Sequence, residues 1–384
     1  MTADQEEIYL DYNASAPLAP VCADAALEYL DGRHGNPSSR HGAGERARRT
    51  LDEARTRVAR LLNAQPAEIV FTSGGTEGNH TAVLGALALA PDRNHIITSA
   101  VEHPSSLLLF KHLESRGTRV TYLPVDGKGR LDLRQLEEAI GDDTALVSLM
   151  WANNETGVLF PVADIGRLVK SRGILFHSDA VQAAGKLPVD IKDTPIDLLT
   201  LSGHKLHAPP GVGALYVRKG IKIPPLLFGH QERNRRGGTE NMPGIVALGV
   251  AALLAMDSMQ TDTTRIAALR DRLERGITDR FQFATVNGGG AERVVNTANI
   301  RFGELNAEAI VHKLDRKGVY VSQGAACSAG GSEPSHVLTA MGLSREAASA
   351  SVRFSLGRET EARQIARVLE LLAEIIASGV ADAA

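Results

Sequence analysis

Between residues 69 and 217, short apolar runs alternate with segments of helical pattern, and this alternation constrains the fold more than any other feature of the chain. Continuous apolar runs that alternate with helices are typical of a parallel or mostly parallel sheet covered on both faces. Seven strands are predicted, at residues 69–72, 95–98, 120–123, 145–149, 174–177, 198–201 and 213–217. We therefore predict an α/β fold with a mostly parallel seven-stranded sheet.

The pattern of predicted helices and strands changes after Pro243. Two long helices are predicted, at 245–259 and 263–281. Shorter elements follow, with strands at 297–300, 319–322 and 351–354 and helices at 307–317 and 361–377. This mixed order favours a second, smaller α+β domain. We place the large domain at residues 13–259 and the small domain at residues 1–12 and 260–384.

Composition excludes several classes of protein. Hydrophobic residues make up 43% of the chain and charged residues 23%, which is the mix of an ordinary globular protein. The formal net charge is −3, so no overall field attracts the protein to nucleic acid or to anionic lipid. We therefore predict no direct binding of nucleic acid.

The cysteines and histidines give no sign of a disulfide framework or a metal site. Cys22 and Cys327 are far apart, and no HExxH or paired-cysteine motif accompanies His204 and His207. The first residues are acidic and polar, unlike a secretory signal, and no apolar run approaches the roughly 18 residues that span a bilayer. We expect a cytoplasmic protein without a membrane partner.

Residues that could bind a ligand or take part in catalysis follow three of the predicted strands. Ser73-Gly74-Gly75-Thr76 comes after the first strand, Asp179 after the strand at 174–177, and Lys205 after the strand at 198–201. In open α/β sheets, ligands bind at the carboxyl ends of the strands. The glycine-rich turn and Asp179 each have an ordinary alternative explanation, a tight turn or a helix N-cap.

Taken together, the three features match the requirements of pyridoxal 5′-phosphate (PLP) chemistry. A lysine forms the Schiff base, an acid holds the pyridine nitrogen protonated, and a helix N-terminus holds the phosphate. Two further polar clusters follow strands, Glu102-His103 and residues 153–157.

Three other features have two readings each. Cys327 is flanked by glycine and small residues, which favours an exposed, mobile thiol, whereas Cys22 lies in a helical segment and is expected to be buried. Arg353 lies among apolar and small residues, where it either binds a ligand or pairs with a structural carboxylate. The polar stretch 231–238 is the best candidate for a mobile or interface loop.

Seven motifs make the chain resemble the cysteine desulfurases of the NifS/IscS type, in the class V aminotransferase superfamily. They occur in family order and spacing from about residue 8 to 358, at residues 9–14, 36–41, 71–77, 153–157, 202–205, 236–241 and 352–357. The resemblance implies a homodimer with the fold-type I PLP architecture. It also implies an enzyme that converts L-cysteine to L-alanine and a protein-bound persulfide.

The resemblance implies roles for the residues at the strand ends. Lys205 is expected to form the Schiff base with PLP, Asp179 to pair with the pyridinium nitrogen, and Gln182 to reach the ring hydroxyl. His103 is expected to stack on the ring and to assist proton transfer. The phosphate is expected to be held by Gly75, Thr76, Ser202 and His204, with Thr239 supplied by the other subunit.

The same resemblance implies how substrate is handled. Asn154, which also contacts the cofactor, and Arg353 are expected to fix the carboxylate of L-cysteine, and Cys327 is expected to accept its sulfur. An acceptor protein is expected to receive the sulfur next. The pathway served is expected to be DNA phosphorothioation, with iron–sulfur assembly and tRNA thiolation as alternatives.

Two further functions are kept as alternatives. One is a different fold-type I PLP enzyme, such as an aminotransferase or a selenocysteine lyase, and the other is a sulfur-relay scaffold without turnover. Near His207 and at Gly237 the residues differ from those usual in the family, and these differences remove no catalytic group.

Overall fold

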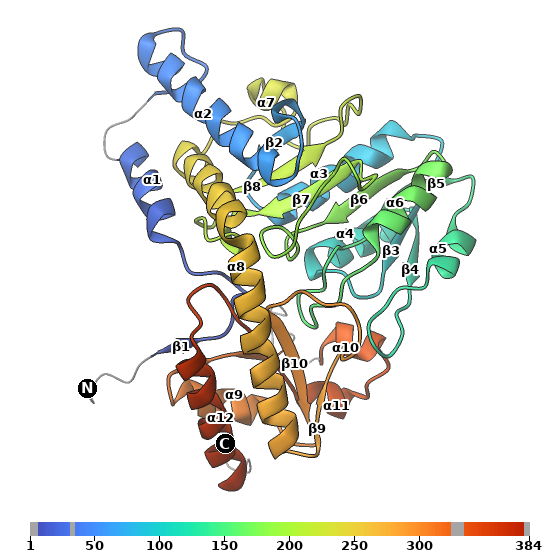
Figure 1. The fold of residues 1–384 in the computed structure, drawn as a ribbon. Coiled ribbons are helices and arrows are strands. Elements are labelled where there is room, and N and C mark those ends of the chain that lie inside the picture. The colour runs from blue at the N-terminus through green and yellow to red at the C-terminus, as the bar shows by residue number, and fades with distance from the viewer. Residues whose placement is uncertain (1–6, 31–34, 324–333, 380–384) are drawn as a thin grey trace.

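The computed structural model describes residues 7–30, 35–323 and 334–379, and Figure 1 shows its arrangement. A seven-stranded sheet has the strand order β2-β8-β7-β6-β5-β3-β4. The five strands from β7 to β4 are parallel, whereas β8 runs antiparallel to both of its neighbours, which confirms the predicted mostly parallel sheet. The strands are β2 (Ile69–Thr72), β3 (His95–Ser99), β4 (Arg119–Leu123), β5 (Thr144–Ser148), β6 (Leu175–Asp179), β7 (Leu198–Ser202) and β8 (Gly213–Val217).

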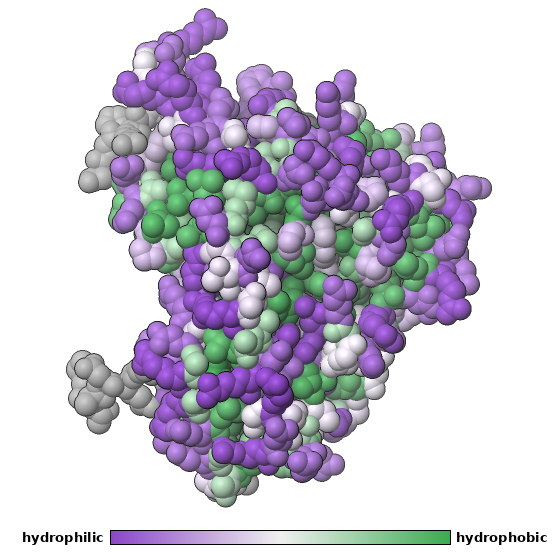
Figure 2. Space-filling model, viewed as in Figure 1, coloured by the Kyte–Doolittle hydropathy of each residue, from purple (hydrophilic) through white to green (hydrophobic). Residues whose placement is uncertain are grey.

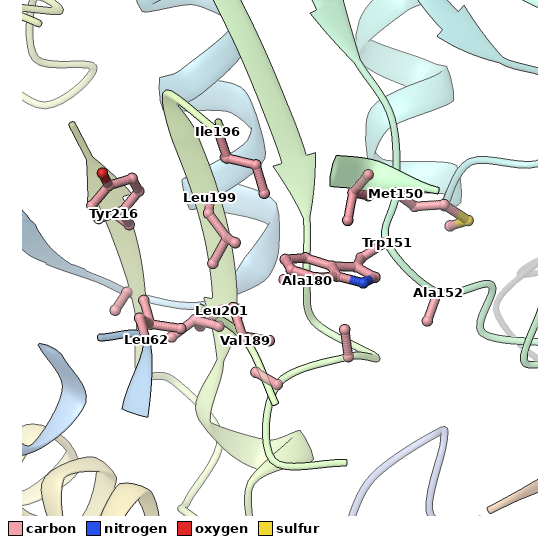
Figure 3. Close-up of a cluster of buried hydrophobic side chains, with 14 of the residues drawn as sticks. Leu62, Met150, Trp151, Ala152, Ala180, Val189, Ile196, Leu199, Leu201 and Tyr216 are labelled. Carbon is pink, nitrogen blue, oxygen red and sulfur yellow. The ribbon is translucent and has the colours of Figure 1, made fainter. Parts of the chain in front are cut away.

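Neighbouring residues on each central strand are buried on opposite faces of this sheet. Ile96 and Leu198 lie in one apolar cluster, and Ile97 and Leu199 lie in another. Figure 3 shows part of the second cluster, with Leu199 and other buried side chains packed together. This double burial explains why the strands are rich in apolar residues without a strict alternation of polar and apolar positions. The first cluster includes α3 (Gly75–Leu89) and α4 (Pro104–Ser115), and the second includes α1 (Pro20–Leu30), α2 (Gly42–Leu61), α5 (Leu133–Ala139), α6 (Val162–Ser171) and the first part of α8 (Met242–Arg280).

A separate apolar cluster lies around a four-stranded antiparallel sheet of order β12-β13-β10-β9. Ile8 and Leu10 from the N-terminal segment belong to this cluster. Strand β1 (Ile8–Tyr9) pairs in parallel with β11 (Val319–Tyr320), which ties the N-terminal segment to it. The other elements here are β9 (Ala284–Val286), β10 (Thr297–Phe302), α9 (Ala307–Asp315), β12 (Ser322–Gln323), α10 (His336–Ala340), α11 (Arg345–Ser349), β13 (Ser351–Ser355) and α12 (Ala362–Ala377). The domain limits given above stay a prediction.

Helix α8 joins the two parts and corrects one prediction. The two helices predicted at 245–259 and 263–281 are one continuous helix of 39 residues. The residues between them, 260–262, are polar but include no glycine or proline, so nothing in the chain interrupts the helix. By length and composition α8 could cross a membrane, but its first part packs in the cluster under the large sheet and its last part around the small sheet.

The stretch 231–238, predicted as a mobile or interface loop, is fixed at Glu232. This residue belongs to α7 (Gln231–Asn234), a short turn in which three successive residues have positive φ between 48° and 63°. Its carboxylate accepts two bonds from the Arg55 guanidinium, at 2.6 and 2.7 Å, and one from the Phe71 backbone N–H at 2.9 Å. Arg55 and Glu232 are both buried. We infer that this buried ion pair holds a turn that L-residues rarely adopt.

We expect the Glu232→Gln variant to lose about 3–5 kcal/mol of unfolding free energy, because the substitution leaves the buried Arg55 charge without a counter-charge. Urea unfolding followed by circular dichroism measures the change. Glu53→Gln is a matched control on the same helix as Arg55, because Glu53 is exposed and pairs only with Arg57, and we expect it to stay within about 0.5 kcal/mol of wild type. A Glu232→Gln protein as stable as this control would contradict the role given to the pair.

Candidate active site

A cavity of about 230 Å³ lies at the carboxyl ends of β5, β6 and β7. Its walls come from segments that are far apart in the sequence, including the N-terminal segment, the start of α3 and strand β13. Ten of the predicted site residues line it: Gly75, Thr76, His103, Asn154, Asp179, Gln182, Ser202, His204, Lys205 and Arg353. Cys327 lies outside the described residues.

Lys205 reaches this cavity from the 3-10 turn that directly follows β7 (Gly203–Lys205). Its Nζ donates to the backbone carbonyl oxygens of Asn13, in a very short bond, and of Ala14, at 2.6 Å. Two backbone carbonyls can hold an ammonium group without forming a salt bridge. The amine is therefore positioned at the cavity wall by the N-terminal segment of the chain.

Asp179 is the last residue of β6 and is 8% exposed. Its Oδ2 accepts a hydrogen bond from Asn79 Nδ2 at 2.7 Å, and its Oδ1 accepts from the Val181 backbone N–H at 2.9 Å. These two bonds fix the plane of the carboxylate at the edge of the cavity. A fixed, largely buried carboxylate is suited to hold a protonated ring nitrogen.

The N-terminus of α3 forms a different wall. The helix begins at Gly75, so the first backbone N–H groups have no partner within the helix and carry its positive dipole end. A Cβ atom at Gly78 would lie 2.7 Å from Thr200 Cγ2, so glycine at this position lets the helix pack closely on β7. Burial is the main cause that lowers the pKa of nearby His204, to about 4, with the charge of Lys205 acting in the same direction. A neutral His204 beside the helix terminus and Ser202 leaves an anion site made of N–H and O–H donors.

His103 caps α4 and lines the same cavity. Its Nδ1 accepts the Ser105 backbone N–H at 3.2 Å and lies 2.8 Å from Ser105 Oγ. Burial lowers the pKa of His103, the charge of Asp179 opposes that effect, and Lys205 and His336 add to it. A neutral imidazole whose Nδ1 accepts a hydrogen bond carries its proton on Nε2. The Nε2–H group of His103 can therefore donate a hydrogen bond or a proton.

Glu102, next to His103, joins the loops that follow β3 and β5. Its carboxylate is fully buried, and Oε1 accepts from Ser99 Oγ at 2.6 Å and from the Met150 backbone N–H at 3.0 Å. Burial raises the pKa of Glu102 to about 8, so the group is mostly protonated at neutral pH. These hydrogen bonds connect the loop that carries His103 to the segment that leads from β5 to Asn154.

Arg353 pairs with a carboxylate, as one of its two readings expected, and it also lines the cavity, so the other reading, ligand binding, stays a prediction. Its Nη2 pairs with Asp11 Oδ1 at 2.7 Å, and its Nη1 donates to the Asn154 backbone carbonyl at 3.1 Å. The residue is 2% exposed, and its Nε has no hydrogen-bond partner. A buried guanidinium that lines the cavity and retains an unused donor is suited to bind a carboxylate.

Thr239 does not line this cavity in the chain that carries it. It lies in a separate cavity of about 140 Å³ together with Glu232 and Arg236. Its supply from a second subunit stays a prediction.

Two asparagines of the site were not assigned a role from the sequence. Asn13 is the most connected of them: its backbone carbonyl accepts from Lys205 and from Gln182 Nε2, and its side chain bonds to residues of both parts of the protein. Asn79 holds Asp179. Its position three residues after Thr76, on the same helix face, was a signal that could have identified it.

The residues present fit PLP. Lys205, the Asp179 carboxylate, the N-terminus of α3 and the Arg353 guanidinium all belong to residues that line one cavity, which offers an amine, a carboxylate and two sites suited to anions. Within the described residues, no group of three or more His, Cys, Asp or Glu side chains could hold a metal ion. Fold and cavity together define a fold-type I PLP-dependent enzyme.

Comparison with known proteins specifies the class further. The family model described as aminotransferase class-V matches residues 8–368. A cysteine desulfurase of Trichormus azollae is 50% identical over 96% of this chain and 92% of its own length, and the cysteine desulfurase NifS of Azotobacter vinelandii is 48% identical over 97% and 93%. The chain belongs to the cysteine desulfurases of the class V aminotransferase family.

Solved structures agree with this assignment. A NifS-like protein superposes with a TM-score of 0.91 at 33% identity, covering 97% of this chain and all of the other. DndA from Streptomyces lividans superposes with a TM-score of 0.77 at 38% identity, covering 88% and 97%. Members of the family depend on PLP and take sulfur from L-cysteine, leaving L-alanine.

Proposed function

We propose that this chain binds PLP through Lys205 in the cavity described above and transfers the sulfur of L-cysteine to Cys327. The observation that carries the proposal is the meeting of Lys205, Asp179, the α3 N-terminus and Arg353 in one cavity. No pair of these four features is adjacent in the sequence, so their convergence is a property of the fold.

Each residue has a part that its geometry supports. Arg353, which lines the cavity, binds the substrate carboxylate, and the backbone carbonyl of Asn154 keeps its guanidinium in place. Bound PLP supplies an electron sink for negative charge at the substrate Cα. The Lys205 amine takes the Cα proton, and the carbonyl oxygens of Asn13 and Ala14 stabilise the resulting ammonium. His103 supplies a proton from Nε2.

The sulfur step is a displacement at the substrate sulfur. The thiolate of Cys327 forms an S–S bond while the substrate C–S bond breaks, and the electron pair of that bond stays on the carbon. Protonation of this carbon then gives L-alanine. The products are a persulfide on Cys327 and free alanine, so atoms and electrons balance without another reactant.

The Cys327→Ser variant tests this assignment. We expect it to bind PLP with the visible absorbance of wild type and to form no persulfide, with sulfur-linked alanine production reduced at least about 10²-fold, because serine is a far weaker nucleophile. Alanine and sulfide released from L-cysteine are the measured products. The matched control is Cys22→Ala, since Cys22 is buried outside the cavity, and it is expected to retain wild-type turnover. Full turnover by Cys327→Ser would overturn the choice of nucleophile.

We also propose that the enzyme works as a homodimer. Leu18 and the α1 residues Val21, Leu27 and Leu30 expose 44–69% of their surface, and Phe228 exposes 86%. Figure 2 shows apolar surface over α1 among hydrophilic surroundings. Exposed apolar side chains grouped in this way are typical of a protein–protein interface. A second subunit would also supply Thr239 to the phosphate site.

A protein is the proposed acceptor of the sulfur, in the cytoplasm, with no membrane partner. The net charge of −3 gives no field that would attract DNA or RNA directly. Identity to DndA is 38%, compared with 48% to NifS, so the comparisons do not favour the predicted DNA phosphorothioation pathway over iron–sulfur assembly or tRNA thiolation.

A further inference from the structure

A lysine other than Lys205 lies beside the cofactor cavity. Lys186 follows Gln182 by four residues, and its Nζ donates to Gln182 Oε1 in a very short bond and to Asn13 Oδ1 at 3.3 Å. Gln182 and Asn13 are both buried, at 5% and 2% exposure. The stem of Lys186 lines a second cavity, of about 70 Å³, that shares Lys205 with the first.

The contact with Lys186 determines the orientation of the Gln182 side-chain amide. An ammonium group only donates hydrogen bonds, so the atom that meets Lys186 must be the amide oxygen. The amide nitrogen then lies on the other side, where it donates one hydrogen to the Asn13 carbonyl at 3.0 Å. Its second hydrogen is left for a group in the cofactor cavity, which Gln182 lines.

We propose that Lys186 is a positioning residue that orients the Gln182 carboxamide, so that its N–H₂ group rather than its oxygen serves the ring hydroxyl oxygen of the cofactor. The proposal rests on the PLP site proposed above. Without Lys186 the amide is free to rotate about its last bond, and its oxygen would then repel the ring oxygen. The same lysine also links this contact to Asn13, which holds the Lys205 amine.

The surroundings of Lys186 disfavour the positive charge on its amine. Burial is the main cause that lowers the pKa of Lys186 to about 7, and the cations Lys205 and Arg353 lower it further. The cavity behind it also contains His207, Asp262 and Arg358, of which the last two are paired at 3.0 Å. The neutral amine can still donate to the amide oxygen but can also accept a hydrogen bond, so Lys186 imposes the orientation of Gln182 most strongly while it is protonated.

A donor to the ring oxygen stabilises negative charge there and so disfavours protonation of the neighbouring nitrogen that joins Lys205 to PLP. Asp179, His103 and His204 also face this linkage, and the substitutions below leave them unchanged. We expect the Lys186→Met variant to raise the pKa of the linkage by roughly half a unit to one unit. A pH titration of the visible absorbance of the purified holoenzyme measures it without any turnover.

A double-mutant cycle separates orientation from charge. If Lys186 acts through Gln182, the Lys186→Met substitution shifts the pKa in the wild-type background and produces little further shift in a Gln182→Ala background. Lys186→Arg, which keeps a donor, is expected to restore the wild-type value. Lys192→Met is the matched control, because Lys192 is exposed and its Nζ bonds to Asn63, outside both cavities.

Other outcomes overturn the proposal. An unchanged pKa in Lys186→Met, or an equal shift in the Gln182→Ala background, would show that Lys186 does not act through the amide. Should Lys186→Met fail to fold, Lys186→Ala carries the same expectation, because the side chain borders a cavity. A wild-type protein with no visible absorbance to titrate would instead refute the PLP site itself, so the two failures are distinguishable.

Discussion

The Lys205→Ala variant is expected to lose at least about 10³-fold in turnover of L-cysteine, because it removes the proposed attachment point of PLP and the proposed base for the Cα proton. The fold is expected to survive, since Lys205 lies at the wall of a cavity and its Nζ donates to the backbone carbonyls of Asn13 and Ala14. Production of alanine from L-cysteine by PLP-loaded protein is the measurement.

Two controls make the Lys205 result specific. Lys170→Ala changes an exposed lysine on α6 and is expected to leave turnover unchanged. A small free amine added to Lys205→Ala is expected to restore part of the activity, because it can enter the space left by the side chain and act as a base. Retention of more than about a tenth of wild-type turnover by Lys205→Ala, with no added amine, would exclude Lys205 as the base.

The second large effect is expected at Asp179. The Asp179→Asn variant keeps the shape of the side chain and loses its negative charge. The protonated form of the ring nitrogen, which makes PLP an electron sink, is then less stable. We expect a loss of about 10²–10³-fold in kcat, in the range seen when one stabilising electrostatic contact is removed. The KM for L-cysteine is expected to change little, because Arg353, the proposed contact of the substrate carboxylate, is unchanged.

Steady-state kinetics with saturating PLP measure both parameters. Asp190→Asn serves as the control, since Asp190 binds Asn63 and Lys192 outside the cavity. A variant with raised KM and unchanged kcat would assign Asp179 to substrate binding and would contradict its place beside the ring nitrogen.

The sheet could be predicted from the sequence because its central strands are buried on both faces. A strand such as β7 is then mostly apolar on both faces, with leucine at three of its five positions, and that pattern is visible without the fold. Asp179 ends β6 and Lys205 lies in the turn after β7, so the rule that ligands bind at the carboxyl ends of strands led to both residues, which line one cavity.

Other features depend on contacts between distant segments and left no local signal. Asn13 reaches Lys205 and Asn296 only because β1 pairs with β11 and carries the N-terminal segment across the cavity. Helix α8 was divided in the prediction because polarity at residues 260–262 resembles a loop, although a helix surface is equally polar. The left-handed turn at Glu232 contains no glycine at its positive-φ positions, so only the ion pair with Arg55 reveals it.

The most direct measurement is the site of covalent attachment of PLP. Reduction of the purified holoenzyme with borohydride fixes the cofactor to the amine that holds it, and peptide mapping by mass spectrometry locates that amine. The account predicts a single labelled peptide with the modification on Lys205. A label on Lys186 or any other lysine, or no label in protein that turns over L-cysteine, would contradict the central claim.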